Sequence, residues 1–118
     1  MELREFYDKT GGDYEALVAR LPMGDDFIKK FVFNFLNDGS YAELLQAMEA
    51  QDAETAFRAA HTMKGVCRNL NFDKLGDSSA ELSDAMREGS MEGTEPLYEK
   101  VKEDYAALIA AIKELKGE

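Results

Sequence analysis

The chain has 118 residues, a length that predicts one compact domain, and its apolar share of 45% is that of a folded protein. Its 24 acidic and 14 basic side chains give a formal charge of −10, so neither nucleic acid nor an anionic membrane surface is an expected partner.

Cysteine use and apolar runs bear on where the protein acts. A single cysteine, Cys67, cannot form an internal disulfide, which favours a reducing compartment. The first five residues, MELRE, lack the basic start and the apolar stretch of a secretion signal. The longest apolar run, residues 105–112, is far shorter than the about 20 residues that a membrane span needs. We expect a soluble, cytoplasmic protein.

Helix-favouring residues dominate the chain, and no alternating run of apolar and polar residues predicts a strand. Gly11 and Gly12 separate a short first helix from a second one, which runs from Asp13 to about Arg20 and which Pro22 ends.

A third helix is predicted from about Asp25 to about Ala50, because apolar residues recur at three- and four-residue spacing. These residues are Phe27, Ile28, Phe31, Val32, Phe35, Leu36, Tyr41, Leu44, Leu45 and Met48. Residues 37–40, with the sequence NDGS, either break this helix or form a weak point inside one long helix.

The next helix is predicted over about residues 53–70. Asp52 is its expected N-cap, and Asn71 is its expected end, because asparagine tolerates the left-handed conformation.

Two more helices complete the chain. Asp73 or a neighbour is expected to cap the first, which Gly89 stops. Thr94 is expected to cap the second, which carries Pro96 in its first turn and ends near Lys116.

This pattern predicts an all-α fold, an antiparallel four-helix bundle with short N-terminal helices. We expect a single domain over residues 1–118, with an N-terminal cap over about 1–24 and the bundle over about 25–116.

The inventory of reactive side chains excludes several kinds of site. The chain has one histidine, His61, whereas a zinc site needs about three or four nitrogen or sulfur ligands. A di-iron bundle needs two Glu-x-x-His pairs, which one histidine cannot supply. No glycine-rich phosphate loop follows a strand. We therefore expect no metal, no nucleotide site and no cofactor of the protein's own.

The helix that carries His61 has an apolar face and a polar stripe. The apolar face consists of Ala56, Ala60, Met63, Cys67 and Leu70. His61 lies about 150° from the centre of this face at about 100° per residue. Phe57, Lys64, Gly65 and Arg68 lie close to His61 along the same stripe.

Several features of this stripe are unusual for a plain surface. A mid-helix glycine costs about 1 kcal/mol relative to alanine, and Gly65 clears space beside His61. Lys64 and Arg68 place two cations around one imidazole, and Phe57 adds an apolar contact. This combination suits a nucleophile that accepts an anionic group. From geometry alone, an ordinary surface histidine beside a tolerated glycine explains the pattern equally well.

The sequence around His61 resembles the signature of histidine-containing phosphotransfer (HPt) domains. Residues 60–65 read AHTMKG where the family has Ala-His-x-Leu-Lys-Gly, and residues 69–72, NLNF, and Leu75 follow as in the family. The resemblance covers about residues 25–90 well and the last helix in character. Met63 stands for Leu, and Asn71 stands for Gly; both replacements suit their positions.

Residues ahead of the histidine match the same family. They are Leu44, Leu45, Ala47, Asp52 and Phe57.

The resemblance implies a phosphocarrier rather than an enzyme with its own ATP site. His61 would carry a phosphoryl group and exchange it with an aspartate of a response-regulator receiver domain, or with a hybrid histidine kinase. The receiver would bring Mg²⁺. Lys64 and Arg68 would offset charge on the phosphoryl group, Gly65 would allow close approach, and Phe57 would form part of the docking patch together with His61, Gly65 and Arg68.

Within the family the chain looks like the free-standing bacterial type, and we expect a monomer. Two alternatives stay open: the N-terminal phosphotransfer domain of a chemotaxis-type kinase, and a helical adaptor that carries no phosphate. A piece of a longer hybrid kinase is also compatible with the sequence.

Overall fold

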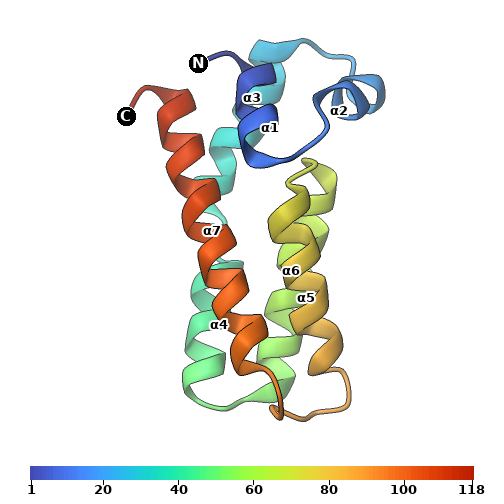
Figure 1. Ribbon diagram of the computed structural model, residues 1–118, viewed down its shortest axis with the longest axis vertical. Coiled ribbons are helices and arrows are strands. Elements are labelled where there is room, and N and C mark those ends of the chain that lie inside the picture. Colours follow the sequence, from blue (N-terminus) through green and yellow to red (C-terminus); the bar gives the residue numbers. More distant parts are fainter.

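The computed structural model describes all 118 residues and contains helices but no strands (Figure 1). The helices are α1 (Leu3–Thr10), α2 (Tyr14–Arg20), α3 (Asp25–Asn34), a short 3-10 helix η1 (Phe35–Asn37), α4 (Ser40–Glu49), α5 (Ala53–Asn69), α6 (Asp73–Ala85) and α7 (Glu95–Lys116). The all-α prediction is confirmed. None of these helices is both long and apolar enough to cross a membrane.

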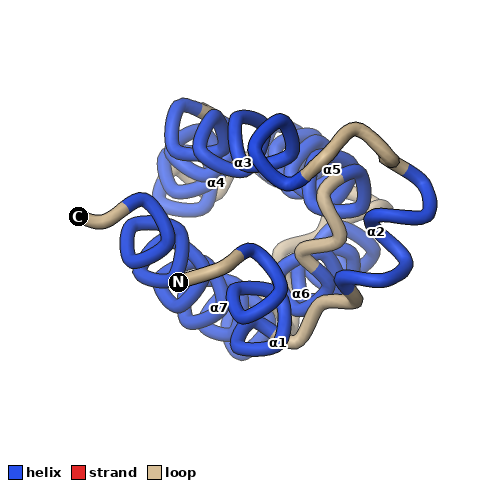
Figure 2. The backbone as a smooth tube through the Cα atoms, turned by 90° about the horizontal axis from the view of Figure 1, so that it is seen from above, coloured by secondary structure: helices blue, strands red, loops and turns tan.

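The long helices form an antiparallel bundle, with α1 and α2 at one end (Figure 1). The α3–α4 pair makes one side, and α5, α6 and α7 make the other three. In the view along the bundle, α5 lies between the α3–α4 side and α6 (Figure 2). Only one stripe of α5 is therefore free to meet a partner.

Residues 37–40 break the predicted third helix into α3 and α4. Asp38 has an extended backbone (ψ 131°), and its carboxylate accepts hydrogen bonds from the backbone amide of Ser40 (3.1 Å) and from the Ser40 hydroxyl. Aspartate side chains make such local bonds in competition with the helical ladder. The α4 helix therefore starts afresh at Ser40, below α3 on the same side of the bundle (Figure 1).

Local hydrogen bonds determine both ends of α5. The side chain of Asp52 accepts from the backbone amide three residues on (3.2 Å), as predicted for an N-cap. At the other end Asn71 is left-handed (φ 54°), and the amide of Phe72 donates to the carbonyl of Cys67 (2.9 Å). Both predictions are confirmed. Gln51, left-handed too (φ 58°), follows α4 in a turn that the sequence did not indicate.

The N-cap positions predicted for α6 and α7 are confirmed, at Phe72, the neighbour of Asp73, and at Thr94, but neither helix is capped by a side-chain hydrogen bond. Phe72 occupies the cap position of α6, and neither it nor Asp73 caps the helix through a side chain. Thr94 precedes α7 as predicted, but its hydroxyl donates to the carbonyl of Met91 (2.7 Å). Phe72 is only 2% exposed, and its ring packs against three other aromatic rings. Burying that ring outweighs a cap bond worth about 1 kcal/mol.

The first two helices clamp the C-terminal end of α5. Tyr7 of α1 is fully buried, and its phenol donates to the carbonyl of Leu70 (2.7 Å). Burial raises the pKa of this phenol well above its ordinary value, so it stays a donor at neutral and mildly alkaline pH. Arg20 of α2 donates to the carbonyl of Asn69 (2.8 Å). Carbonyls that a helix end leaves without partners are thus satisfied from outside.

Helices α5 and α6 pack closely because both carry small residues at buried positions. These residues are Ala56, Ala59 and Ala60 on α5 and Gly76, Ser79 and Ser83 on α6. A Cβ atom at Gly76 would lie 3.4 Å from the Cβ of Cys67 and 3.0 Å from Nη1 of Arg68. A larger residue would crowd this contact, so the close packing limits the rotation of α5.

The clamp predicts an unequal cost for two Tyr→Phe changes. Tyr7→Phe leaves the Leu70 carbonyl without its donor, so the free energy of unfolding should fall by about 1–3 kcal/mol. Tyr14→Phe is the matched control, because its hydroxyl donates to Asp25 (2.6 Å) nearer the surface, where water replaces the bond. Urea unfolding followed by circular dichroism measures both. Equal losses would contradict the clamp.

Candidate functional site

The orientation predicted for α5 is confirmed. The five residues assigned to its apolar face are all buried: Ala56, Ala60, Met63, Cys67 and Leu70. On the opposite stripe His61, Gly65 and Arg68 are exposed and Lys64 is half-buried. The only histidine of the chain therefore faces outward from the middle of a rigid helix.

Gly65 leaves an open space on α5. A Cβ atom added there would meet no other atom within 4 Å, apart from its own helix and chain neighbours. Gly65 lies four residues after His61, one turn along the same stripe. No packing contact explains the glycine, and the bare helix surface beside His61 is accessible to a partner.

Phe57 differs from the sequence-based expectation. Its side chain is not freely exposed; it is half-buried and packs against the hydrophobic core. Its ring stacks on the imidazole of His61, with centroids 5.9 Å apart and an interplanar angle of 23°. The guanidinium of Arg87, just beyond α6, lies over the same ring. Phe57 therefore supports the imidazole from the side.

Two residues, Asp84 in the last turn of α6 and Arg87 just beyond it, complete this environment, and the sequence analysis missed them. The guanidinium carbon of Arg87 lies 5.4 Å from the centre of the Phe57 ring, and Nη2 of Arg87 lies 2.7 Å from Oδ1 of Asp84. We call Phe57, Asp84 and Arg87 the α6 flank of His61. The short turn between α5 and α6 could have indicated these neighbours. In an antiparallel pair of helices, residues at similar distances from the connecting turn lie side by side.

The two basic residues predicted beside His61 have different surroundings. The side chain of Arg68 points to α6, where its Nη1 lies 2.8 Å from Oδ1 of Asp77. Lys64 takes part in none of the ion pairs of the structure. Of the two predicted cations, only Lys64 can therefore bind an incoming anion without first breaking an ion pair.

Exposed aromatic residues lie on α3 rather than at Phe57. Phe27 and Phe31 are 47% and 46% exposed, although the sequence placed them in an apolar stripe with buried neighbours such as Val32. Their ring centroids are 5.6 Å apart. Phe31 also lines a groove of about 560 Å³ with Val66 of α5, one residue beyond Gly65. An apolar surface therefore adjoins the open stripe on the side opposite the α6 flank.

No group of three or more His, Cys, Asp or Glu side chains is arranged to hold a metal ion. Cys67 is fully buried, and burial raises the pKa of its thiol to about 12, so the reactive thiolate is scarce at neutral pH. Neither a set of metal ligands nor a reactive thiol therefore competes with His61 as the reactive group.

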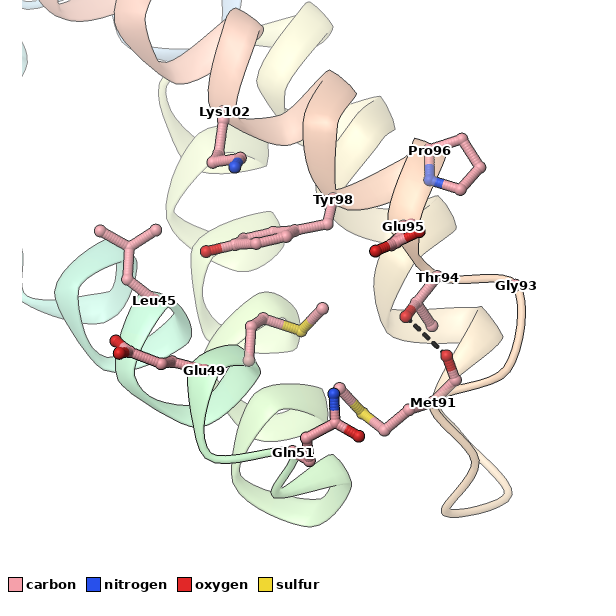
Figure 3. Close-up of a pocket in the computed structure, with 11 residues that line it drawn as sticks. Leu45, Glu49, Gln51, Met91, Gly93, Thr94, Glu95, Pro96, Tyr98 and Lys102 are labelled. Atoms are coloured by element: carbon pink, nitrogen blue, oxygen red, sulfur yellow. Dashed lines mark hydrogen bonds between the residues drawn. The ribbon is translucent and has the colours of Figure 1, made fainter.

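A second hollow lies away from this face, where α4 meets the start of α7, at the opposite end of the bundle from α1 (Figure 1). Figure 3 shows its lining. The hollow is a groove of about 760 Å³ between α4 and the start of α7, into which Tyr98 and Lys102 project. None of the residues of the His61 stripe lines it.

Comparison with protein families gives one match that includes this stripe. The model of the family described as "Hpt domain" matches residues 38–112, which run from the break before α4 into α7. Comparison with curated proteins and with solved structures gives no match.

Proposed function

Since this chain belongs to the Hpt domain family, we propose that it relays a phosphoryl group between His61 and the aspartate of a response-regulator receiver domain. Membership of the family implies histidine phosphotransfer in two-component signalling. Histidine phosphotransfer needs a histidine, and this chain has one, His61, which is exposed within the matched residues. That single observation carries the assignment of the phosphoacceptor.

When the phosphoryl group moves from the receiver to this protein, the imidazole of His61 is the nucleophile. The lone pair of the unprotonated ring nitrogen of His61 forms a P–N bond with the phosphorus of the aspartyl phosphate. The P–O bond to the aspartate breaks, and its electron pair leaves on the aspartate carboxylate. The hydrogen on the other ring nitrogen stays on the ring. The reverse step returns the phosphoryl group to the carboxylate, so the protein acts as a carrier and not as an enzyme.

Phosphoryl transfer passes through a loose transition state, so the carrier contributes alignment and compensation of charge. Stacking on Phe57 holds the imidazole of His61 in place. Lys64, one turn along the stripe and without an acidic partner, supplies positive charge to the phosphoryl oxygens. Arg68 contributes only when its bond to Asp77 opens. The receiver supplies Mg²⁺, and the carrier needs no cofactor of its own.

Docking of the receiver uses the open side of α5. Gly65 lets the backbone of the receiver come close to His61, because Gly65 has no side chain. Phe57 contributes the small part of its surface that stays exposed, and Phe31 extends the apolar contact across the groove beside Val66. A patch of this kind suits a small, transient interface. We further propose that the protein is a monomer and acts in the cytoplasm, and that a hybrid histidine kinase is its other source of phosphate.

Two variants should fail in different ways. His61→Gln removes the atom that forms the P–N bond, so phosphate uptake should vanish, while the bundle stays folded because the side chain is exposed. Lys64→Ala keeps the nucleophile and loses one charge-assisted contact, so transfer should slow by roughly ten- to a hundredfold. The measurement is the rate of exchange with a phosphorylated receiver, with circular dichroism as the check of fold. Uptake by His61→Gln contradicts the assignment of His61 as the phosphoacceptor, whereas an unchanged rate in Lys64→Ala contradicts only the role of the lysine.

Substitutions at Gly65 should separate the stability of the fold from the access of the receiver to His61. Gly65→Ala should preserve or raise stability, by up to about 1 kcal/mol, because its Cβ meets open space. Gly65→Leu should leave the fold intact but block transfer, because a long side chain occupies the space beside His61. Melting temperature and transfer rate measure the two effects, with Gly65→Gln as an intermediate case. Normal transfer by Gly65→Leu would remove the argument from close approach.

A further inference from the structure

Asp84 places a negative charge in the surroundings of His61. The hydrogen bond from Arg87 holds the pKa of the Asp84 carboxyl below its ordinary value, and the charges of Lys64 and His61 act in the same direction. Asp84 is therefore ionised at neutral pH, and the one residue with which it forms an ion pair is Arg87. In the unphosphorylated protein its carboxylate holds the guanidinium of Arg87 at 2.7 Å.

A phosphoryl group on His61 would change this balance of charge. It brings about two negative charges and three acceptor oxygens. Such a group attracts a guanidinium, which matches its oxygens with two parallel N–H donors, and it repels a carboxylate. Arg87 would then have two competing acceptors, the Asp84 carboxylate and the phosphoryl oxygens.

The positions of the side chains allow this change of partner. Arg87 and His61 both contact the ring of Phe57, so the guanidinium is already held on the His61 side of α6. The side chains of Arg87 and Asp84 are 53% and 65% exposed, so the bond between them can open without disturbing the core.

We propose that Asp84 is a positioning residue that competes with the phosphoryl group on His61 for Arg87 and thereby lowers the share of phosphate that His61 holds at equilibrium. The proposal rests on the function proposed above and adds a determinant of the direction of transfer. With Asp84 present, the phosphorylated carrier loses an ion pair that the free carrier keeps. Transfer onward to a receiver is favoured by the same amount.

The test measures the equilibrium ratio of phosphorylated carrier to phosphorylated receiver, with a purified receiver domain that exchanges phosphate with the wild type. Asp84→Asn should raise the phosphorylated share of the carrier, shifting the equilibrium constant roughly two- to fivefold, the range for an exposed ion pair. Arg87→Gln should shift it the other way. Asp84→Glu, which keeps the carboxylate, should behave like the wild type. The shifts should shrink in 1 M salt because of screening.

Glu81→Gln is the matched control. It makes the same change of charge one turn earlier on α6, but Glu81 faces the groove shared with Lys100 of α7. Its equilibrium constant should equal that of the wild type.

A double variant distinguishes competition for Arg87 from a general effect of charge. In the Arg87→Gln background, Asp84→Asn should cause little further shift, because the competed group is gone. An equal shift in both backgrounds, or an equal shift in Glu81→Gln, would overturn the proposal. So would an Asp84→Asn variant that behaves like the wild type while the wild type exchanges phosphate normally. If the wild type takes up no phosphate from any receiver, the proposed function itself fails.

Discussion

The site depends on the burial of one face of α5 between α4 and α6. Small residues on this face and on α6 bring the two helices close, and the buried phenol of Tyr7 holds the far end of α5 through Leu70. Rotating α5 about its axis would expose apolar residues and crowd the contact at Gly76. Because this packing limits the rotation of the helix, His61 points outward. The exposed position of the histidine is thus a consequence of the core.

Charge is distributed unevenly around this fixed point. The chain carries a formal charge of −10, yet Lys64 lies unpaired on the His61 stripe, and Arg87, paired with Asp84, lies over the ring of Phe57. An acidic carrier repels anions at long range, so local cations have to make the phosphoryl group acceptable. The balance between these few side chains is where the stability of the phosphorylated state can be adjusted without any change of fold.

The sequence predicted those features of the site that depend on a single helix, namely which face of α5 is buried and where α5 ends. Helical periodicity placed His61 opposite the buried face, and turn chemistry placed the ends of α5 at Asp52 and Asn71. It did not predict contacts between helices: the half-burial of Phe57, the guanidinium of Arg87 above its ring, and the exposure of Phe31. Periodicity gives an angle around a helix axis, but it does not say how much of that helix its neighbours cover.

The most direct test of the account is to locate the phosphate on the protein. The chain is incubated with a phosphorylated receiver and Mg²⁺, digested at neutral to alkaline pH, where phosphohistidine survives, and sequenced by mass spectrometry. The account predicts one acid-labile phosphoryl group, on the peptide that contains His61 and on that residue. Phosphate on any other residue, or an unmodified chain after exposure to phosphorylated receivers that do charge another Hpt domain, would contradict it.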